Sequence, residues 1–373
     1  MDVKPFRINI PDSELELLSR KLALARLPTN LSHESWAEPN GVSLDLIRST
    51  VDFWREGYKW REEEAKLNEL PQFICPIDVE GFGILDIHFV HSRASAVAAQ
   101  PLLFVHGWPG SFAEVSKILP LLNQAGFDVV APSLPGYGFS SDPGKAGFKY
   151  EQDAEVMHKL MLKLGYNKYV VQGGDWGSDI VRTCGRRYSE HVQAVHINHV
   201  NLITMPKPDF PTEPVYTEFE KRSIRQQEHF TNEEFAYFSI QNSKPRTLGF
   251  AMHDSPVGML SWMVDKLYSW SDHYPWTKTE MITWTLLHYF PGPTTGFRIY
   301  REHGPHKLDE IPYERTPTGV SAFAGEMEMV PRSWGEGTAN ITFWREHESG
   351  GHFAAYEKPD ELARDLIDFF QVG

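Results

Sequence analysis

The chain has 373 residues, of which 41% are hydrophobic and 23% are charged, so it can bury the core of one large globular domain with a lid or arm. Its 50 acidic and 36 basic residues give a formal net charge of −14 without a visible basic run, which argues against a nucleic-acid partner because such binding depends on neutralising phosphates. The 2 cysteines make no disulfide framework, and no apolar stretch has the pattern of a signal peptide or a membrane span, so we expect a soluble cytoplasmic protein without a membrane anchor.

The first 75 residues have a mostly helical periodicity. Apolar residues recur at helical spacing across 11–28, where Asp12 and Ser13 are expected to cap the helix, and again across 43–70. We interpret residues 1–75 as an N-terminal helical arm outside the catalytic body. The arm is also the candidate contact of a homodimer.

After this arm the period of the sequence changes. Residues 77–92 alternate as two antiparallel strands joined near Gly81 and Gly83. Short apolar runs, each followed by a helical pattern, then predict strands buried on both faces of a mostly parallel sheet; they lie in 101–111, 127–138, 168–178 and 192–200.

A helical, aromatic-rich stretch interrupts this alternation before two further strand patterns and a final amphipathic helix. An insert of that size between strands indicates a lid over the sheet. We therefore predict an α/β-hydrolase fold, with the core in residues 76–204 and 306–373 and a helical cap in residues 205–305.

One motif in the predicted core has the pattern of a nucleophile elbow. An apolar strand leads into Gly173-Gly174-Asp175-Trp176-Gly177 and then into a helical pattern. Small residues are needed on both sides because the turn is too tight for a Cβ atom, and the central side chain stands exposed above the sheet. Aspartate before a helix is also a common N-terminal cap, so the motif alone leaves both interpretations open.

The rest of a catalytic triad is expected later in the chain, in the order acid and then histidine. His352 falls just after the last predicted strand. Glu326 and Glu328 both follow the preceding strand, and Glu326 is favoured because it is nearer the strand end. Its carboxylate would accept the second imidazole N–H of His352 and fix the tautomer.

Two backbone N–H groups are candidates for an oxyanion hole. One belongs to Trp176, directly after the aspartate, and the other to Trp108 in the sequence HGWPGS, which follows a predicted strand.

An aspartate at this position changes the chemistry from that of a serine hydrolase. A carboxylate is suited to attack strained or activated saturated carbon, which leaves an alkyl ester on Asp175 that water can hydrolyse. The substrate is then an epoxide or an organic halide. An epoxide oxygen needs an acid, for which tyrosine is suitable; spacing alone does not choose among the candidates Tyr216, Tyr237, Tyr268, Tyr274, Tyr289 and Tyr300.

These motifs together resemble the microsomal-type epoxide hydrolases, in soluble fungal or bacterial form, over nearly the whole chain. The resemblance is carried by PFRINIPDSELELLSRKLALARLP, HGWPGS, GGDWGS, YFSIQNSKP, DSPVGM, PTGVSAF and GGHFAAYEKP. It implies that Asp175 is the nucleophile, His352 the base and Glu326 the supporting acid. It also implies that Tyr237 and Tyr300 donate to the oxygen of a small hydrophobic epoxide. The chain departs from the family's pattern in having AGE where a proline usually precedes the acid.

Two other functions remain as alternatives. A haloalkane or haloacid dehalogenase would use the same aspartate, histidine and oxyanion hole. A non-catalytic ligand-binding protein on this fold usually lacks one of the three catalytic side chains, all of which are present here.

Metal and cofactor sites are not expected. The pairs His88/His91 and His196/His199 have an odd separation, which directs the two side chains of a strand to opposite faces. We therefore expect no metal and no cofactor, with water as the second substrate.

Overall fold

The computed structural model describes residues 3–28, 41–96, 98–201, 205–304 and 312–371. Within these ranges one sheet of nine strands has the order β1-β2-β3-β5-β4-β6-β7-β8-β9. The strands are β1 (Lys4–Pro5), β2 (Gln72–Val79), β3 (Gly83–Ser92), β4 (Gln100–Val105), β5 (Phe127–Pro132), β6 (Tyr169–Gly173), β7 (Val192–Ile197), β8 (Glu314–Gly325) and β9 (Ala339–Gly351).

The sheet has an antiparallel end and a parallel body. Strands β1, β2, β3 and β5 pair in antiparallel fashion, and β2 meets β3 at the Val79–Gly83 pair, which confirms the predicted hairpin. From β5 through β4, β6, β7 and β8 to β9 every pairing is parallel. The expected mostly parallel sheet is therefore confirmed. Its central strands, β4 and β6, are almost entirely buried, as expected for strands with helices on both faces.

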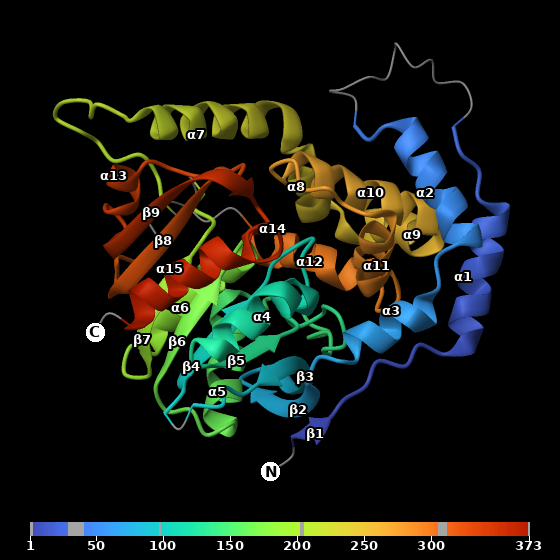
Figure 1. Ribbon diagram of the computed structural model, residues 1–373, viewed down its shortest axis with the longest axis horizontal. Helices are drawn as coiled ribbons and strands as arrows, with labels where there is room; N and C mark the ends of the chain where they lie inside the picture. The colour runs from blue at the N-terminus through green and yellow to red at the C-terminus, as the bar shows by residue number, and fades with distance from the viewer. Residues whose placement is uncertain (1–2, 29–40, 97, 202–204, 305–311, 372–373) are drawn as a thin grey trace.

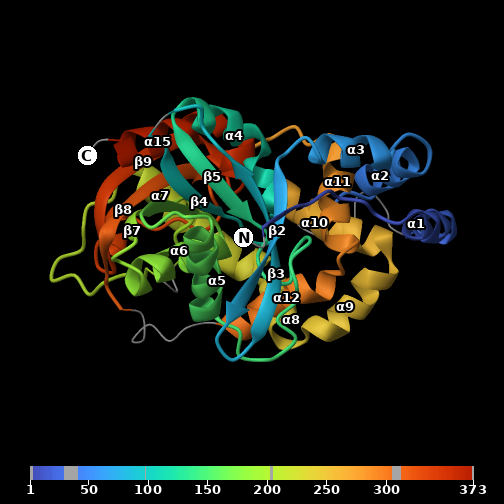
Figure 2. The ribbon, with the colours of Figure 1, turned by 90° about the horizontal axis from the view of Figure 1, so that it is seen from below.

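Helices cover both faces of this sheet. Figure 2 shows α4 (Val115–Gln124) and α15 (Pro359–Gln371) on one face, and α5 (Tyr150–Lys163) and α6 (Trp176–Arg187) on the other. Three short elements complete the core: η1 (Phe112–Glu114), α13 (Arg332–Gly335) and α14 (Ala354–Glu357).

The insert between β7 and β8 forms a layer of helices beside the sheet (Figure 1). It contains α7 (Glu218–His229), η2 (Phe230–Glu234), α8 (Ala236–Ser243), α9 (Pro245–Asp254), α10 (Pro256–Ser269), α11 (Lys278–Tyr289) and α12 (Pro293–His303). Trp108, just after β4, stacks on Tyr237 of α8 with 5.6 Å between ring centroids, so these helices cover the ends of the strands.

The N-terminal helices lie on the outer side of this cap (Figure 1). They are α1 (Asp12–Leu24), α2 (Leu44–Glu56) and α3 (Trp60–Leu67). The expected cap at Asp12 and Ser13 was wrong, since both residues are already helical and Pro11 holds the N-cap position. The periodic segment 43–70 is two helices, because the chain turns at Gly57.

The proposed division of the chain at residues 75, 204 and 305 stays a prediction. In the described ranges, no helix combines the length and the apolar composition needed to cross a membrane.

Candidate active site

The residues with candidate chemical roles meet at one edge of the sheet. Each follows the carboxyl end of a parallel strand, and in such sheets ligands bind outside these ends. The strand and residue pairs are β4 with Trp108, β6 with Asp175, β7 with His199, β8 with Glu326, and β9 with His352.

The turn that carries Asp175 is too tight for larger neighbours. A Cβ atom on Gly173 would lie 2.3 Å from the carbonyl oxygen of Gly177, and one on Gly177 would lie 2.2 Å from that of Val105. Asp175 itself has φ 51° and ψ −133°, a conformation that costs a non-glycine residue on the order of 1–3 kcal/mol. The elbow predicted from the small residues is therefore present in the backbone.

Asp175 occupies the N-cap position of α6, but its side chain makes no capping hydrogen bond. Instead, the backbone N–H of Trp108 donates to Oδ1 of Asp175 at 2.7 Å. The backbone N–H of Trp176 also interacts with this carboxylate. The two N–H groups expected in an oxyanion hole thus converge on Asp175, and the capping interpretation is wrong.

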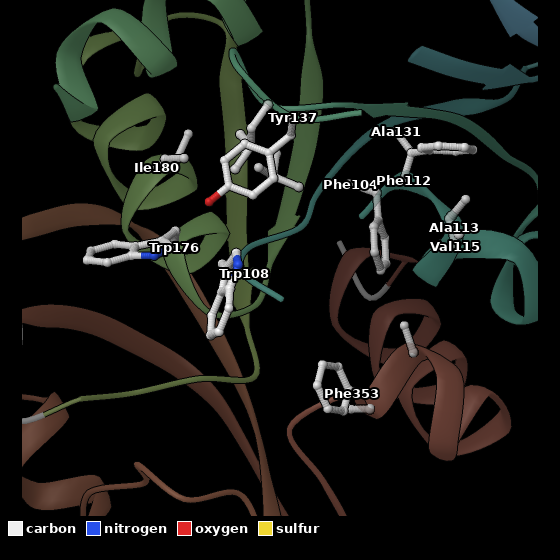
Figure 3. Close-up of a cluster of buried hydrophobic side chains, with 14 of the residues drawn as sticks. Phe104, Trp108, Phe112, Ala113, Val115, Ala131, Tyr137, Trp176, Ile180 and Phe353 are labelled. Carbon is white, nitrogen blue, oxygen red and sulfur yellow. The ribbon is translucent and has the colours of Figure 1, made fainter. Parts of the chain in front are cut away.

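The tryptophans themselves belong to the buried core at the strand ends. Figure 3 shows Trp108, Trp176 and Phe353 among other buried hydrophobic side chains. A polar carboxylate in this setting has few water molecules to solvate it, so its protein partners control its charge.

Those partners form a chain of three ionisable groups. Nε2 of His352 lies 3.5 Å from Oδ2 of Asp175, and Nδ1 of His352 lies 3.0 Å from Oε2 of Glu326. Burial alone would raise the pKa of both acids, but the imidazole holds the pKa of Asp175 below its usual value and helps to lower that of Glu326 to about 2. Burial alone would lower the pKa of His352, yet the two carboxylates raise it well above its usual value. The resting site is therefore an imidazolium between two carboxylates.

A second histidine also contacts Glu326. Nδ1 of His199 lies 3.2 Å from Oε1 of Glu326, and Nε2 of His199 lies 3.8 Å from Oε2 of Glu328. Although burial opposes protonation, the charge of Glu326 raises the pKa of His199 to about 9. Desolvation raises the pKa of Glu328 to about 7.

Two tyrosines from the cap face this cluster. Tyr237 of α8 is 5% exposed and Tyr300 of α12 is 1% exposed. The Tyr300 hydroxyl makes no hydrogen bond of normal geometry within the described residues, although its ring lies 4.9 Å from that of Trp176. Burial raises the pKa of both hydroxyls well above the usual value, so both stay protonated and can donate.

Two small cavities adjoin Asp175 on different sides. The cavity toward the cap is about 40 Å³ and is bordered by Asp175, Tyr237, Tyr300 and Glu328. The cavity toward the core is about 10 Å³, enough for about one water molecule, and is bordered by Asp175, His352 and Glu114. Desolvation raises the pKa of Glu114 to about 8, so its carboxyl group is mostly neutral at pH 7.

A larger cavity of about 770 Å³ lies among charged residues of α5, α6 and β8. It borders on Tyr150 and Asp179, which also line the cap-side cavity, but it reaches neither Asp175 nor His352. Asp175, His352 and the two tyrosines therefore border the two smaller cavities.

Comparison with known proteins identifies the family. Residues 3–115 match the family described as "Epoxide hydrolase N terminus", and residues 100–273 match "alpha/beta hydrolase fold". The chain is 33% identical to "Juvenile hormone epoxide hydrolase 1" of Ctenocephalides felis, with 98% of this chain and 85% of that protein covered. It is 31% identical to "Epoxide hydrolase 1" of Sus scrofa, with 98% and 88% covered. The chain belongs to the epoxide hydrolase family.

A solved structure agrees with this assignment. The epoxide hydrolase of Aspergillus niger is 33% identical to this epoxide hydrolase and superimposes with a TM-score of 0.90, covering 100% of this chain and 96% of the other. The fold and the enzyme class expected from the sequence are thereby confirmed.

The structure brings together all seven side chains or N–H groups singled out in the sequence of this epoxide hydrolase. Between the two candidate acids, Glu326 contacts His352 at 3.0 Å, whereas the carboxylate of Glu328 lies 3.8 Å from His199. The sequence patterns do not identify His199, because its spacing from His196 bears only on metal binding. It lies two residues after the end of β7, and that position was the available indication.

The ligand atoms of His199, Glu326 and His352 lie within 4.8 Å of one another, which is close enough to hold a cation. Hydrogen bonds from both imidazoles to the carboxylate account for this spacing equally well, because the N–O distances are 3.0 and 3.2 Å. We interpret the group as a hydrogen-bonded cluster.

Proposed function

We propose that this epoxide hydrolase converts an epoxide to a vicinal diol through a covalent ester on Asp175. The observation that carries the proposal is the position of the Asp175 carboxylate, which lies between the Trp108 N–H and the His352 imidazole and borders the cap-side cavity. Held ionised by these partners, the carboxylate attacks a ring carbon from the core side of the cavity.

Tyr237 and Tyr300 act as the acids of this first step. The epoxide oxygen leaves carbon as an alkoxide, and a hydroxyl on the opposite wall of the cavity donates a proton to it. Both hydroxyls are protonated at neutral pH because burial raises their pKa values. The products of this step are the alkyl ester and a tyrosinate.

Esterification also changes His352. One of its two carboxylate partners loses its charge, so the pKa of His352 falls and its proton can return to the tyrosinate through the pocket. The imidazole is then neutral, as a general base must be.

Water completes the cycle from the core side. The one-water cavity borders on both Asp175 and His352. His352 removes a proton from this water, and the oxygen adds to the ester carbonyl while the N–H groups of Trp108 and Trp176 stabilise the oxyanion. Collapse of the intermediate expels the diol and restores the Asp175 carboxylate and the His352 imidazolium, so one water is consumed and all protons balance.

The substrate is a small hydrophobic epoxide, since aromatic rings dominate the cap-side wall: Trp176, Phe235, Tyr237, Phe238 and Tyr300. A volume of about 40 Å³ is far below the roughly 300–1,000 Å³ of ligand pockets in general, so the cap must move to admit a substrate. Family membership favours an epoxide over the halide of a dehalogenase.

We also propose a cytoplasmic location and a homodimeric assembly for this enzyme. The chain has only 2 cysteines, too few for a disulfide framework, which supports a reducing compartment such as the cytoplasm. A homodimer formed through the N-terminal arm stays a prediction, to be checked by light scattering.

The experiment that tests the reaction measures diol formation from racemic styrene oxide. The wild-type enzyme should form diol, and Asp175→Ala should form none. His352→Ala should be alkylated once and then stall, so intact-protein mass should show one added styrene oxide. Diol formation by Asp175→Ala, or an unmodified mass for His352→Ala, would contradict the covalent mechanism.

A further inference from the structure

His199 lies in the catalytic cluster without touching the reacting carboxylate. It follows the end of β7 by two residues and its side chain is 4% exposed. Both of its ring nitrogens face carboxylates, Nδ1 that of Glu326 at 3.2 Å and Nε2 that of Glu328 at 3.8 Å. A buried histidine with two acidic partners carries a positive charge, in agreement with its raised pKa of about 9.

Glu326 is consequently shared between two imidazoles. His352 donates mainly to Oε2 at 3.0 Å, His199 donates to Oε1 at 3.2 Å, and the backbone N–H of Glu328 donates to Oε1 at 3.3 Å. Three donors on two oxygens fix the plane of the carboxylate, and this plane sets the direction of the His352 ring.

The second imidazole also opposes protonation of the first. The ring centroids of His199 and His352 are 5.5 Å apart. Like charges at this separation lower the affinity of each group for its proton. This matters in the alkyl-enzyme, because the charge of Glu326 favours the protonated form of His352, which cannot accept a proton from water.

We propose that His199 is a positioning residue that orients Glu326 and whose positive charge keeps His352 in the neutral form while Asp175 is esterified. This inference rests on the proposed function. In this role His199 acts through Glu326 and His352 and does not contact the reacting atoms of the substrate.

Other ionisable groups face these two imidazoles. Asp175 comes from the turn before α6, Glu326 and Glu328 follow β8, and two further glutamates interact with His352, namely Glu114 of η1 and Glu357 of α14. Desolvation raises the pKa of Glu357 to about 7 and that of Glu114 to about 8. All five are acids, so His199 is the member of this set whose charge repels a proton on His352.

The test replaces His199 by asparagine. The side-chain amide of the introduced asparagine can donate near the position of Nδ1, so His199→Asn keeps a hydrogen-bond donor toward Glu326 and removes the charge. Rapid-quench single turnovers with styrene oxide, read by intact-protein mass, give the rates at which the Asp175 ester forms and decays between pH 5 and 9. We expect the acid limb of ester decay to move upward by about one pH unit, so that decay below the limb is about tenfold slower than in the wild type. Ester formation should stay within the same order of magnitude.

The control is His347→Gln, which removes the imidazole that pairs with the buried carboxylate of Asp365, outside the catalytic cluster. His347 pairs through Nε2 with Asp365 at 2.6 Å, and its side chain is 13% exposed. This variant should keep the wild-type profile of ester decay. If His199→Asn does not fold, as judged by circular dichroism, His199→Gln takes its place.

A profile for the folded His199 variant that superimposes on that of the wild type would overturn the inference and leave His199 a structural role. Failure of the proposed function would look different, because the wild type and His352→Ala would then show no ester at any pH.

Discussion

Loss of the hydroxyl group of Tyr237 or Tyr300 should affect formation of the ester on Asp175 and leave the later hydrolysis of that ester unchanged. Replacing either by phenylalanine keeps the ring packing against Trp108 and Trp176 but removes one proton donor. We expect ester formation on Asp175 to slow by roughly 10- to 100-fold in each variant, because the second tyrosine can still donate. Decay of the ester should be unchanged. Rapid-quench kinetics with styrene oxide measure both rates.

Tyr268→Phe is the matched control for these variants. Tyr268 lies in α10 and is 45% exposed, outside the cavities at Asp175. Its loss should leave both rates at the wild-type value. A tyrosine variant with an unchanged rate of ester formation would remove that residue from the proposed site.

Gly107 is required by the position of the Asp175 carboxylate. A Cβ atom on this residue would lie 2.0 Å from Oδ1 of Asp175, which is the oxygen that accepts the Trp108 N–H. We expect Gly107→Ala to displace the carboxylate and to lower the rate of ester formation by more than about 100-fold, since misplacement of a reacting group by about 1 Å costs on that order.

Gly249→Ala provides a comparable collision away from the chemistry. Its Cβ atom would lie 2.0 Å from Oγ1 of Thr294, between α9 and α12. This variant should lose stability and keep its rate of ester formation once folded. Equal losses of rate in both variants would mean that the effect at Gly107 is a general loss of structure.

At the level of helices and strands, sequence patterns predicted the parallel body of the sheet and the residues at its carboxyl edge. Strands buried on both faces are continuous apolar runs, and the loops that follow them carry the candidate catalytic side chains. This is why Asp175, Glu326 and His352 could be placed from the sequence. His199 occupies the same kind of position. Its contact with Glu326 depends on β7 lying next to β8, and this neighbourhood is set by the order of strands in the sheet.

Helix boundaries and the short first strand were harder to predict. The periodicity of 43–70 continues through Gly57, so the separation of α2 from α3 depends on a local turn with little effect on the pattern. Strand β1 has two residues and exists because its backbone pairs with the distant β2, where Lys4 lies opposite Ile74. No local pattern encodes such a contact.

The link between α3 and the segment before α1 yields a prediction about stability. Oε1 of Glu64 accepts the backbone N–H of Ile10 at 2.8 Å and the indole N–H of Trp60 at 3.0 Å, and Glu64 is 7% exposed. Glu64→Ala leaves two buried donors unsatisfied, so we expect the free energy of unfolding to fall by about 2–3 kcal/mol. Urea denaturation measures this quantity.

Glu62→Ala in the same helix is the control, because the Glu62 side chain is 65% exposed and pairs with an exposed lysine. Its effect should be within about 0.5 kcal/mol. If the two variants lost the same stability, the hydrogen bonds of Glu64 would not be what fixes the arm.

For the molecule as a whole, buried ionisable groups determine how the free energy of unfolding depends on pH. Several buried histidines are neutral in the folded state, where desolvation lowers their pKa values to about 3 or 4: His88, His91, His106, His158, His196 and His288. In the unfolded chain they bind protons below about pH 6.5. The unfolded state therefore binds more protons between about pH 4 and 6.5, and stability should rise with pH across this interval.

On the alkaline side, the free energy of unfolding should fall as pH rises. The pKa is raised to about 7 for Glu328 and Glu357, to about 8 for Glu114 and to about 9 for His199, so these groups keep protons in the folded state that the unfolded state releases at lower pH. Their contribution is lost as pH rises through these folded values. Below about pH 6.5 the six histidines make stability rise with pH, and they outnumber the three glutamates, which make it fall. Above about pH 6.5 these histidines are neutral in both states and no longer contribute to the pH dependence. We therefore expect the free energy of unfolding to be greatest near pH 6.5 and to fall toward pH 9.

Urea denaturation at half-unit intervals from pH 4 to 9 measures this curve, and the variant His199→Asn separates one contribution from the others. The His199 imidazolium stabilises the fold fully below the unfolded pKa of about 6.5, and this stabilisation disappears as pH rises through the folded pKa of about 9. The variant should therefore be less stable than the wild type at pH 6.5, with the two curves approaching each other by pH 9. A difference between the curves that stays constant from pH 6.5 to 9 would mean that His199 is neutral in the folded enzyme. Its charge could then not be what keeps His352 ready to accept a proton from water.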